Sequence, residues 1–486
     1  MTSRLSAFYD VVICGASIAG CATAQALVDA DPSGRRSVLL FDLHRDVSPR
    51  FSGEMLHPTG VDVLDELGFL DPLLADGAVH VEGFAVSETA DADPVRLDYR
   101  DVPGSRPHGL GVHHKTLVRR MRDRVRDSRV DVRGGLRLVE LLRDGEAVRG
   151  VVVRDAEGQT HSIRADVVVG ADGKASSTRR LAGIPDHRET LGFTGGVEVV
   201  DPQLPSPLHA NVVLGAPGPM LCYPIERRDD GLLTSRVTFD LPHRLPAKGP
   251  GLVQYLLDAF VPYLPEELAG QVAAALVERV RSGGKLEMAP TVNLPAPPAV
   301  LPGLALVGDA GGCSHPITAS GMTMGLLDAR TMGQVARTRR GAAAEGPWLD
   351  AASLRQYRSA HDRYVPTRQA LADAIYEAFR GEGDGARAIR RALFSYWRES
   401  PQNRQRSLAL LACAEGRPRV FLAEYLRTAR HAVEASLTPA HATHLPVEDR
   451  LRQVQSTMGL AGDKFGLVAQ VAWAQLRPSW LSSLGA

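Results

Sequence analysis

The first forty residues of the chain carry the pattern that most restricts its fold. An apolar run at 9–14 is followed by the turn Gly-Ala-Ser-Ile-Ala-Gly at 15–20 and by an Ala-rich segment that extends to about residue 30. A second apolar run at 37–41 ends on Asp42. The order strand, glycine turn, helix, strand and acidic residue is the dinucleotide-binding fingerprint in the context that it requires. It predicts a parallel α/β unit with a phosphate site at the helix N-terminus.

Each position of this fingerprint has a physical role. Gly15 permits the tight turn, Gly20 lets helix and strand approach closely, and Asp42 can accept a hydrogen bond from a ribose hydroxyl. Ser17 occupies the second glycine position, where its side chain slightly crowds the approach to a pyrophosphate. A purely structural turn is the alternative interpretation, which the two flanking strands and the acidic residue disfavour.

Two later stretches repeat the succession of apolar strand, acidic residue, glycine and helix. The first runs from 166 to 180 and carries Asp172 just after its strand. The second runs from 304 to 327, breaks at Gly308-Asp309 and then enters an apolar helix. A carboxylate between a buried strand and a helix N-terminus suits a polar ligand that carries oxygens. Either stretch alone fits an ordinary strand–loop–helix connection, but together with the first turn they favour one extended cofactor.

The composition and the spacing of residues exclude several classes of function. The formal net charge is zero, and no basic patch indicates a nucleic-acid partner. Five scattered cysteines form no metal spacing, and the adjacent His113 and His114 would point to opposite faces of a strand, so we predict no metal site. The cysteine usage favours a reduced, cytoplasmic setting. The chain reaches its first strand by residue 10, which leaves no room for a signal peptide, and no apolar run approaches the ~20 residues that span a bilayer.

Three motifs in this order resemble those of the single-component, aromatic hydroxylase-like FAD-dependent monooxygenases. They are Gly15-x-Ser17-x-x-Gly20, Asp172-Gly173-x-x-Ser176-x-x-Arg179 and Gly308-Asp309. Within that family the chain is most similar to squalene epoxidases and their bacterial relatives. Those enzymes carry a Gly-Glu-x-Leu-x-Pro-x-Gly loop, seen here at 53–60, and a His-His segment leading to an Arg, seen here at 113–122. Their Gly-Asp-Ala loop continues through His-Pro-(Leu/Ile)-Thr to Gly-Met, as 308–322 does.

The resemblance, which covers about residues 9–335, implies where FAD would bind. The adenosine half would lie on the first turn, Arg50 and Arg122 near the pyrophosphate and ribityl chain, and Asp309 on ribityl or pyrophosphate-side hydroxyls. The backbone of Gly321-Met322 would meet the pyrimidine edge of the flavin. The predicted cofactor-binding residues are Gly15, Ser17, Ile18, Ala19, Gly20, Asp42, Arg50, Arg122, Asp172, Gly308, Asp309, Pro316, Gly321 and Met322.

The resemblance also indicates the substrate side. Phe84, Cys222 and Tyr223 are predicted to line the substrate site, although Cys222 and Tyr223 fit plain core positions equally well. His315 and Tyr223 are the candidate catalytic residues. Pro316 beside His315 also fits a role for this histidine in shaping the loop.

Several positions depart from the family pattern. Asp42 stands where the family usually has Glu, and Leu43 stands where squalene epoxidases have a basic residue. Ala319-Ser320 replaces glycines next to the flavin, and Phe84 replaces a Tyr. We also expect no N-terminal membrane segment of the kind that squalene epoxidases carry. These departures argue against squalene as the substrate and leave the flavin chemistry intact.

The predicted fold class is α/β, with a Rossmann-type FAD-binding domain interleaved with a β-sheet substrate domain and followed by a C-terminal helical region. The chain has 486 residues, which exceeds a single compact core. The FAD-binding domain is predicted at 1–75, 105–188 and 286–335. The substrate domain is predicted at 76–104 and 189–285, and the helical region at 336–486.

The predicted function is that of an FAD-dependent monooxygenase in bacterial secondary metabolism. It would insert one oxygen atom from O2, through a flavin C4a-hydroperoxide, into a small hydrophobic substrate, with NAD(P)H as the reductant. Epoxidation of an alkene and hydroxylation of an aromatic ring both fit. A separate flavin reductase and peripheral membrane contact through the C-terminal helices are compatible with the sequence.

Other flavoprotein functions remain as alternatives. A reductase of the geranylgeranyl reductase type would carry similar loops, and a non-enzymatic flavin-binding protein is the least favoured reading. A flavin-dependent halogenase is disfavoured because its Trp-x-Trp-x-Ile-Pro motif is missing. The tryptophans of this chain lie at 348, 397, 473 and 480.

Overall fold

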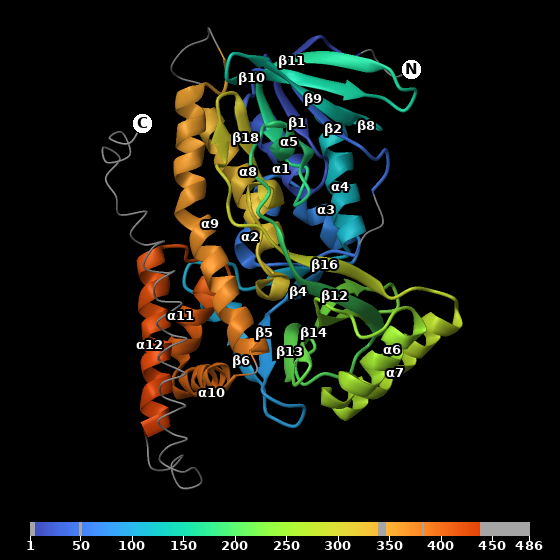
Figure 1. Cartoon of the computed structure of the whole chain (residues 1–486), viewed down its shortest axis with the longest axis vertical. Coiled ribbons are helices and arrows are strands. Elements are labelled where there is room, and N and C mark those ends of the chain that lie inside the picture. The colour runs from blue at the N-terminus through green and yellow to red at the C-terminus, as the bar shows by residue number, and fades with distance from the viewer. Residues whose placement is uncertain (1–4, 48–50, 339–346, 382, 438–486) are drawn as a thin grey trace.

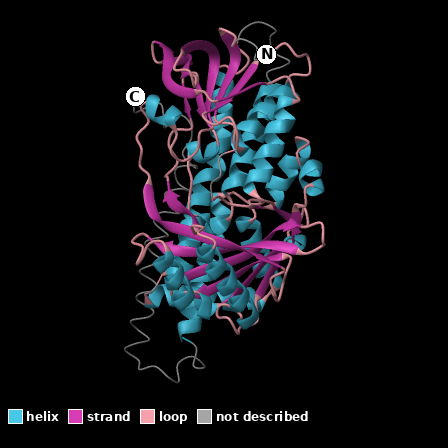
Figure 2. Ribbon diagram, turned by 90° about the vertical axis from the view of Figure 1, so that its right-hand side faces the viewer, coloured by secondary structure: helices cyan, strands magenta, loops and turns pink. Residues whose placement is uncertain are grey.

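The computed structural model describes residues 5–47, 51–338, 347–381 and 383–437. Two large β-sheets lie one above the other along the long axis, and the C-terminal helices run along one side (Figure 1). Seen from the side, helices fill the space between the two sheets (Figure 2). Arg50 lies outside the described residues, so its predicted contact with the cofactor stays a prediction.

The first sheet has eight strands and a parallel centre. Its order is β17-β18-β11-β1-β2-β8, parallel from β18 to β8, with β10 and β9 attached antiparallel beside β11. Cys14 pairs with both Phe41 and Gly170, and Gly170 pairs with Leu306, so the three predicted loops leave the same edge of the sheet. The strands are β1 (Phe8–Cys14), β2 (Val38–Asp42), β8 (Asp131–Gly134), β9 (Arg137–Asp144), β10 (Ala147–Arg154), β11 (Thr160–Gly170), β17 (Val300–Leu301) and β18 (Leu304–Leu306).

Small side chains let helices pack closely beside this sheet. A Cβ on Gly333 of α8 would lie 2.9 Å from the Cβ of Ala26 on α1, so this glycine sets how closely the two helices approach. The buried face of this layer is apolar, from Val11 and Ile13 on β1 to Met332 on α8. The helices of this region are α1 (Ile18–Ala30), α2 (Pro58–Glu66), α3 (Leu70–Ala75), α4 (His114–Arg126), α5 (Ser177–Leu181) and α8 (Gly321–Thr338).

The second sheet has seven strands in the order β16-β12-β15-β14-β13-β5-β6 and is antiparallel except for the β13–β5 pair. Helices α6 (Pro250–Ala259) and α7 (Glu266–Arg281) cover one face through an apolar core. The predicted boundary at 286 assigns β16 to the FAD-binding domain, but β16 pairs with β12 in this sheet. The strands are β5 (Gly83–Ser87), β6 (Val95–Asp98), β12 (Glu189–Val200), β13 (His209–Gly215), β14 (Gly218–Arg227), β15 (Leu233–Pro242) and β16 (Glu287–Asn293).

A small sheet and four short helical turns complete this part of the described fold. The small sheet has the order β3-β7-β4. Its strands are β3 (Met55–Leu56), β4 (Val79–Val81) and β7 (Gly109–Gly111). The turns are η1 (Tyr99–Asp101), η2 (Val261–Tyr263), η3 (Gly308–Gly311) and η4 (Pro316–Thr318).

The long helix α9 (Ala351–Arg380) reaches both large sheets. Near its start, the hydroxyl of Tyr357 donates to the backbone oxygen of Leu306 in the first sheet at 2.7 Å. At its end, Arg380 forms an ion pair with Asp240 in the second sheet. Helices α10 (Asp384–Glu399), α11 (Pro401–Leu411) and α12 (Pro418–Leu437) follow, and none of the helices within the described part of the chain is long and apolar enough to cross a membrane. The predicted α/β fold class with a C-terminal helical region is confirmed.

Candidate active site

The three loops at the edge of the first sheet open on a large cavity between this sheet and the second one. Its empty volume is about 1980 Å³ including the open mouth. Its walls come from residues 17–19, 51–55, 171, 173 and 174, from much of 308–325, from β14, β15 and β16, and from α9. Because elements of both sheets line it, the cavity is long enough to suit an extended ligand.

The glycine turn forms one end of this cavity. Gly15 has a φ of 109°, and a Cβ there would lie 2.5 Å from the backbone oxygen of Ala171. A Cβ on Gly20 would lie 1.8 Å from the oxygen of Gly15, so neither glycine tolerates a side chain. Ser17 is the N-cap of α1, and Ser17, Ile18 and Ala19 line the cavity. A helix N-terminus at the cavity wall is a site for a phosphate.

Asp42 and Arg122 fix the backbone of this turn. The carboxylate of Asp42 accepts from the backbone N–H of Ala16 at 2.8 Å and from that of His44 at 2.8 Å. Arg122, which is buried, donates to the backbone oxygen of Ala16 at 2.6 Å and lies 3.2 Å from the Asp42 carboxylate. Both residues therefore position the turn, and their direct contacts with a cofactor stay predictions.

Asp172 is turned into its own loop. Its carboxylate accepts from the hydroxyls of Ser176 and Thr178 and from the backbone N–H of Thr178, so it orders the start of α5. The cavity wall in this loop is instead formed by its neighbours Ala171, Gly173 and Lys174. Asp172 thus shapes its own loop, because the nearest hydroxyls and N–H groups belong to that loop, and its predicted role as a cofactor ligand stays a prediction.

The loop at Gly308-Asp309 is held from below by a buried carboxylate that sequence reasoning missed. The backbone N–H of Gly308 donates to Asp328 on α8 at 2.7 Å, and the hydroxyl of Tyr364 on α9 donates to the same carboxylate at 2.5 Å. Burial raises the pKa of Asp328. The half-buried Asp309 lines the cavity beside it. An aspartate in the middle of an apolar helix is the signal that would have found this brace.

The segment after this loop carries a strained residue. Ala319, which replaces a family glycine, has a φ of 51°, a left-handed conformation that costs an alanine roughly 1–2 kcal/mol. The backbone oxygen of Thr318 accepts from Nε2 of His57 at 2.7 Å, and Nδ1 of His57 lies 2.8 Å from the hydroxyl of Tyr99. Burial lowers the pKa of His57 to about 4, so the ring is a neutral brace. Pro316, Gly321 and Met322 line the cavity, and their contacts with a cofactor stay predictions.

On the second sheet, neighbouring residues of β14 face opposite ways. Leu221 and Tyr223 line the cavity, whereas Cys222 lies in the apolar core beneath α6 and α7. The prediction that Cys222 lines the substrate site is therefore wrong, since successive side chains of a strand alternate between its two faces. Tyr223 remains a candidate, and burial raises its pKa far above the usual range.

A second, apolar cavity adjoins the first. Ile317 lines both, and Phe84 lines the second one. Its empty volume is about 1040 Å³ including the mouth. It lies between the second sheet and the C-terminal helices. Its other walls are mainly aliphatic and aromatic, including Val86, Leu97, Val212, Leu371, Ala374, Ile375, Ala378, Phe379, Ile389, Leu393, Trp397, Leu410, Leu411 and Phe421.

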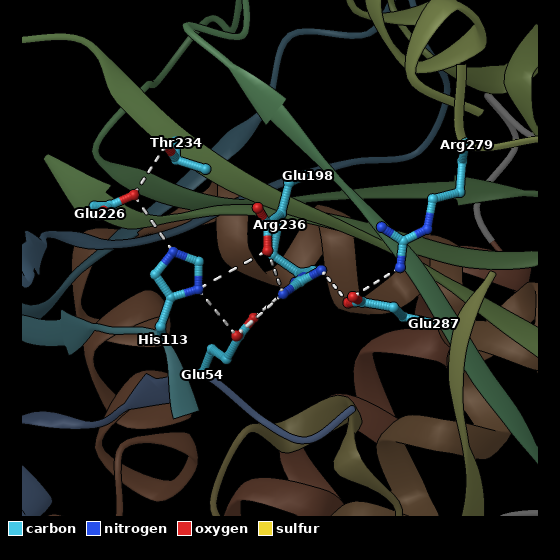
Figure 3. Close-up of polar contacts among 8 residues, drawn as sticks. All are labelled: Glu54, His113, Glu198, Glu226, Thr234, Arg236, Arg279 and Glu287. Carbon is cyan, nitrogen blue, oxygen red and sulfur yellow. Dashed lines mark hydrogen bonds and ion pairs between the residues drawn. The ribbon is translucent and has the colours of Figure 1, made fainter. Parts of the chain in front are cut away.

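A buried ion cluster joins the layers beside the first cavity (Figure 3). Arg236 on β15 pairs with Glu54 at 2.7 Å, Glu198 at 2.9 Å and Glu287 at 3.0 Å. His113 lies 3.6 Å from Glu54, which itself lines the cavity. Burial acts to raise the pKa of Glu54, but hydrogen bonds to His113 and Arg236 outweigh it and hold the pKa below its usual value. Sequence reasoning missed this cluster, although Glu54 and His113 both stand in motifs that the sequence showed and Arg236 lies inside a strand of otherwise uncharged residues up to Asp240.

The residues that line the first cavity fit FAD. The glycine turn has no room for a side chain, the N-terminus of α1 meets the cavity, and Asp309, Gly321 and Met322 line it as well. A model of an FAD binding domain matches residues 8–229. Fold and site together define an FAD-dependent monooxygenase. A squalene epoxidase model matches residues 164–448, and the chain belongs to the squalene epoxidase family.

Individual relatives agree with this assignment. The chain is 31% identical to squalene epoxidase 2, mitochondrial, of Arabidopsis thaliana over 88% of its own length and 71% of that protein. It is 28% identical to squalene epoxidase erg1 of Aspergillus fumigatus, over 80% of this chain and 79% of the other. The solved structure of Klebsiella pneumoniae HpxO with FAD and uric acid has a TM-score of 0.64 at 19% identity, covering 82% of this chain and 96% of that one, and shows the shared fold. The predicted family and cofactor are confirmed, and NAD(P)H is the reductant typical of the family.

Proposed function

We propose that this monooxygenase acts on an elongated apolar molecule that carries an alkene or an aromatic ring. The observation that supports it is the second cavity, whose walls are almost entirely apolar and which shares the wall residue Ile317 with the cofactor cavity. An apolar molecule in this chamber would place one end beside the loop at 315–322. Squalene is the substrate in the names of the relatives, but the departures at Leu43, Phe84 and Ala319-Ser320 argue against it here and favour other polyenes or arenes.

We propose the following division of labour among the residues. The turn at 15–20, with Asp42 and Arg122 behind it, would hold the adenosine half of FAD, and Asp309 with the backbone of Gly321-Met322 would hold the flavin half. FAD, when bound, supplies the oxygen-activating chemistry. The protein binds the substrate, orients it and keeps water away through the apolar walls. Tyr223 would line the substrate side of the first cavity.

Oxygen insertion is tested with the purified, FAD-loaded protein, NADPH and a panel of alkenes and arenes under ¹⁸O2. The expected result is a product that gains one ¹⁸O atom, detected by mass spectrometry. A saturated product that also forms without O2 would instead indicate a reductase of the geranylgeranyl reductase type. Product that gains bromine only when bromide is present would indicate a halogenase.

The place of the substrate is tested by filling the second cavity. Ala374 on α9 lines it, so Ala374→Trp is expected to lower kcat/KM at least tenfold while the FAD content stays unchanged. The matched control is Ala274→Trp on the exposed face of α7, which is expected to retain full activity. Full activity of both variants would contradict the placement.

The domain boundaries, the cellular location and the partners of the protein are proposals as well. The predicted three-part domain division is kept, with β16 moved to the substrate domain. We propose a cytoplasmic location, supported by the five cysteines, all of which have free thiols. Adding a flavin reductase to the assay tests whether the protein depends on a separate reductase. Co-sedimentation with lipid vesicles tests whether the C-terminal helices contact a membrane surface.

A further inference from the structure

A buried histidine ties the loop after β3 to the wall of the cofactor cavity. His57 is the N-cap of α2 and is 0% exposed. Its Nε2 atom lies 2.7 Å from the backbone oxygen of Thr318, and its Nδ1 atom lies 2.8 Å from the hydroxyl of Tyr99. A carbonyl oxygen only accepts, so Nε2 carries the proton of the neutral ring and Nδ1 accepts from Tyr99. The hydrogen bonds therefore run in one direction, from Tyr99 through His57 to Thr318.

The surroundings of His57 fix the direction of this donor. Burial lowers the pKa of the ring to about 4, so His57 is neutral at neutral pH. The ring centroid of Phe84 lies 5.9 Å from that of His57 and 6.2 Å from that of Tyr99. The backbone N–H of His57 donates to the hydroxyl of Thr323 on α8 at 3.2 Å. His57 is thus attached to α8 by its backbone and to the segment before α8 by its ring.

The bond to Thr318 fixes one edge of a peptide in that segment. The oxygen of this peptide accepts from His57, and its N–H, which belongs to Ala319, donates to the oxygen of Pro316 at 2.8 Å. The φ angle of Ala319 is the rotation between this peptide and the chain that enters α8 at Gly321. Its value of 51° is left-handed, which alanine disfavours by a factor of about 5–30. Holding the peptide therefore holds Ala319 in a conformation that alanine alone would not prefer.

The held segment is part of the wall of the cofactor cavity. The wall residues here are Ala319, Ser320, Gly321 and Met322. A change of φ at Ala319 would turn the backbone on one side of this residue relative to the other and so change the shape of the wall. We propose that His57 is a positioning residue of the FAD site, which holds Ala319 in its left-handed conformation through the hydrogen bond to Thr318.

The population of the left-handed conformation sets the size of the expected effect. When only a fraction of the molecules has the backbone that binds a ligand, the apparent Kd rises by the inverse of that fraction. Without the bond from His57, the preference of alanine would raise the Kd of FAD about 5–30-fold. Glycine adopts left- and right-handed conformations about equally, so in an Ala319→Gly background the same loss would raise the Kd only about twofold.

The test compares two replacements of His57 that reproduce different ring nitrogens. The amide of His57→Asn stands in for Nδ1 and keeps a partner for Tyr99, whereas the longer amide of His57→Gln stands in for Nε2 and donates to Thr318. The Kd of FAD is measured on the full-length holoenzyme, from the flavin fluorescence released on serial dilution. We expect His57→Asn to raise this Kd about 5–30-fold and His57→Gln to keep it within about threefold.

The Ala319→Gly background separates positioning from general packing. There we expect His57→Asn to raise the Kd of FAD no more than about threefold. The matched control is His209→Asn, which removes another buried histidine, whose Nε2 lies 2.8 Å from the carboxylate of Asp98. This control should lower Tm and leave the Kd of FAD within about twofold of the wild type, because His209 lines neither cavity.

Several outcomes would overturn the inference. A Kd that His57→Asn leaves unchanged would mean that the ring only packs. An equal rise with alanine and with glycine at position 319, or no rescue by His57→Gln, would mean that the ring does not act through Ala319. Failure of His57→Asn to fold in both backgrounds would assign a general structural role, whereas folding in the glycine background alone would support the inference. Because FAD binding is measured without substrate, a failure here is distinguishable from failure of the proposed function, which the ¹⁸O2 experiment tests.

Discussion

The buried ion cluster makes a quantitative prediction for Arg236→Met. The methionine fills most of the space but leaves the three carboxylates without their common cation. Glu198 and Glu287 have side chains that are 44% and 39% exposed, so both can turn to water at little cost. The Glu54 side chain is only 6% exposed and would keep His113, 3.6 Å away, as its remaining partner. Removal of one member of a buried ion pair costs about 3–5 kcal/mol, and we expect a loss of that size, nearly all of it from Glu54.

The assay is equilibrium urea denaturation of the FAD-loaded protein, with flavin and tryptophan fluorescence as separate probes. The double variant Arg236→Met/Glu54→Gln should recover at least ~2 kcal/mol, because it removes the uncompensated charge. Glu287→Gln alone is the matched control and should cost less than about 1 kcal/mol.

The pH dependence of the stability tests the role of Glu54 independently. In the wild type the pKa of Glu54 is depressed, so its stabilisation is present above the unfolded pKa of about 4.5 and is lost as pH falls through the lower folded pKa. Without Arg236, burial would raise the folded pKa of Glu54, and the penalty of the variant should shrink as pH falls from 8 toward 5. Two results would refute the assignment of this cost to the buried carboxylate of Glu54. One is a loss of less than about 1 kcal/mol in the free energy of unfolding of Arg236→Met. The other is a larger loss that persists both at low pH and in the double variant with Glu54→Gln.

Three further outcomes follow from the site. Asp309→Ala should purify with much less FAD, measured as the ratio of flavin to protein absorbance; a stoichiometric flavin content would show that the cofactor is misplaced. Ala319→Gly should raise stability by ~0.5 kcal/mol or more, because glycine relieves the left-handed strain, and an unchanged denaturation midpoint would argue against that strain. The hydrogen bond to Glu54 raises the pKa of His113, so its contribution to stability is fully present below the unfolded pKa of about 6.5 and is lost as pH rises through the folded pKa. His113→Gln should remove that loss from the pH–stability profile, and an identical profile would count against it.

The sequence allowed the cofactor side of the site to be predicted because its geometry is local. Each of the three loops directly follows a strand, and parallel neighbours end at one edge, so recognising the strands was enough to bring Gly15 and Asp309 together. The helix that follows the glycine turn and the strand that ends at Asp42 were confirmed in the same way, although the helix begins at Ile18, inside the predicted turn.

The features that were missed depend on register and on long-range pairing. Whether Cys222 or Tyr223 faces the cavity is decided by a shift of one residue, which an all-apolar strand does not encode. The pairing of β16 with β12 and the contact of Arg236 with Glu54 join residues far apart in the chain. The orientation of Asp172 depends on competition between its own loop and a ligand, and a motif alone does not resolve it.

Helix α9 lines both cavities with different parts of one surface. Residues 361, 365, 368 and 369 line the cofactor cavity, and residues 371, 374, 375, 378 and 379 line the apolar one. The second set follows the spacing i, i+3, i+4, i+7, i+8 of a single helical face. A combinatorial library restricted to these five codons would therefore vary the shape of the apolar cavity while leaving every position of the helix that lines the cofactor cavity in its natural state. Altered substrate scope and retained flavin loading could then be selected in one short stretch of DNA.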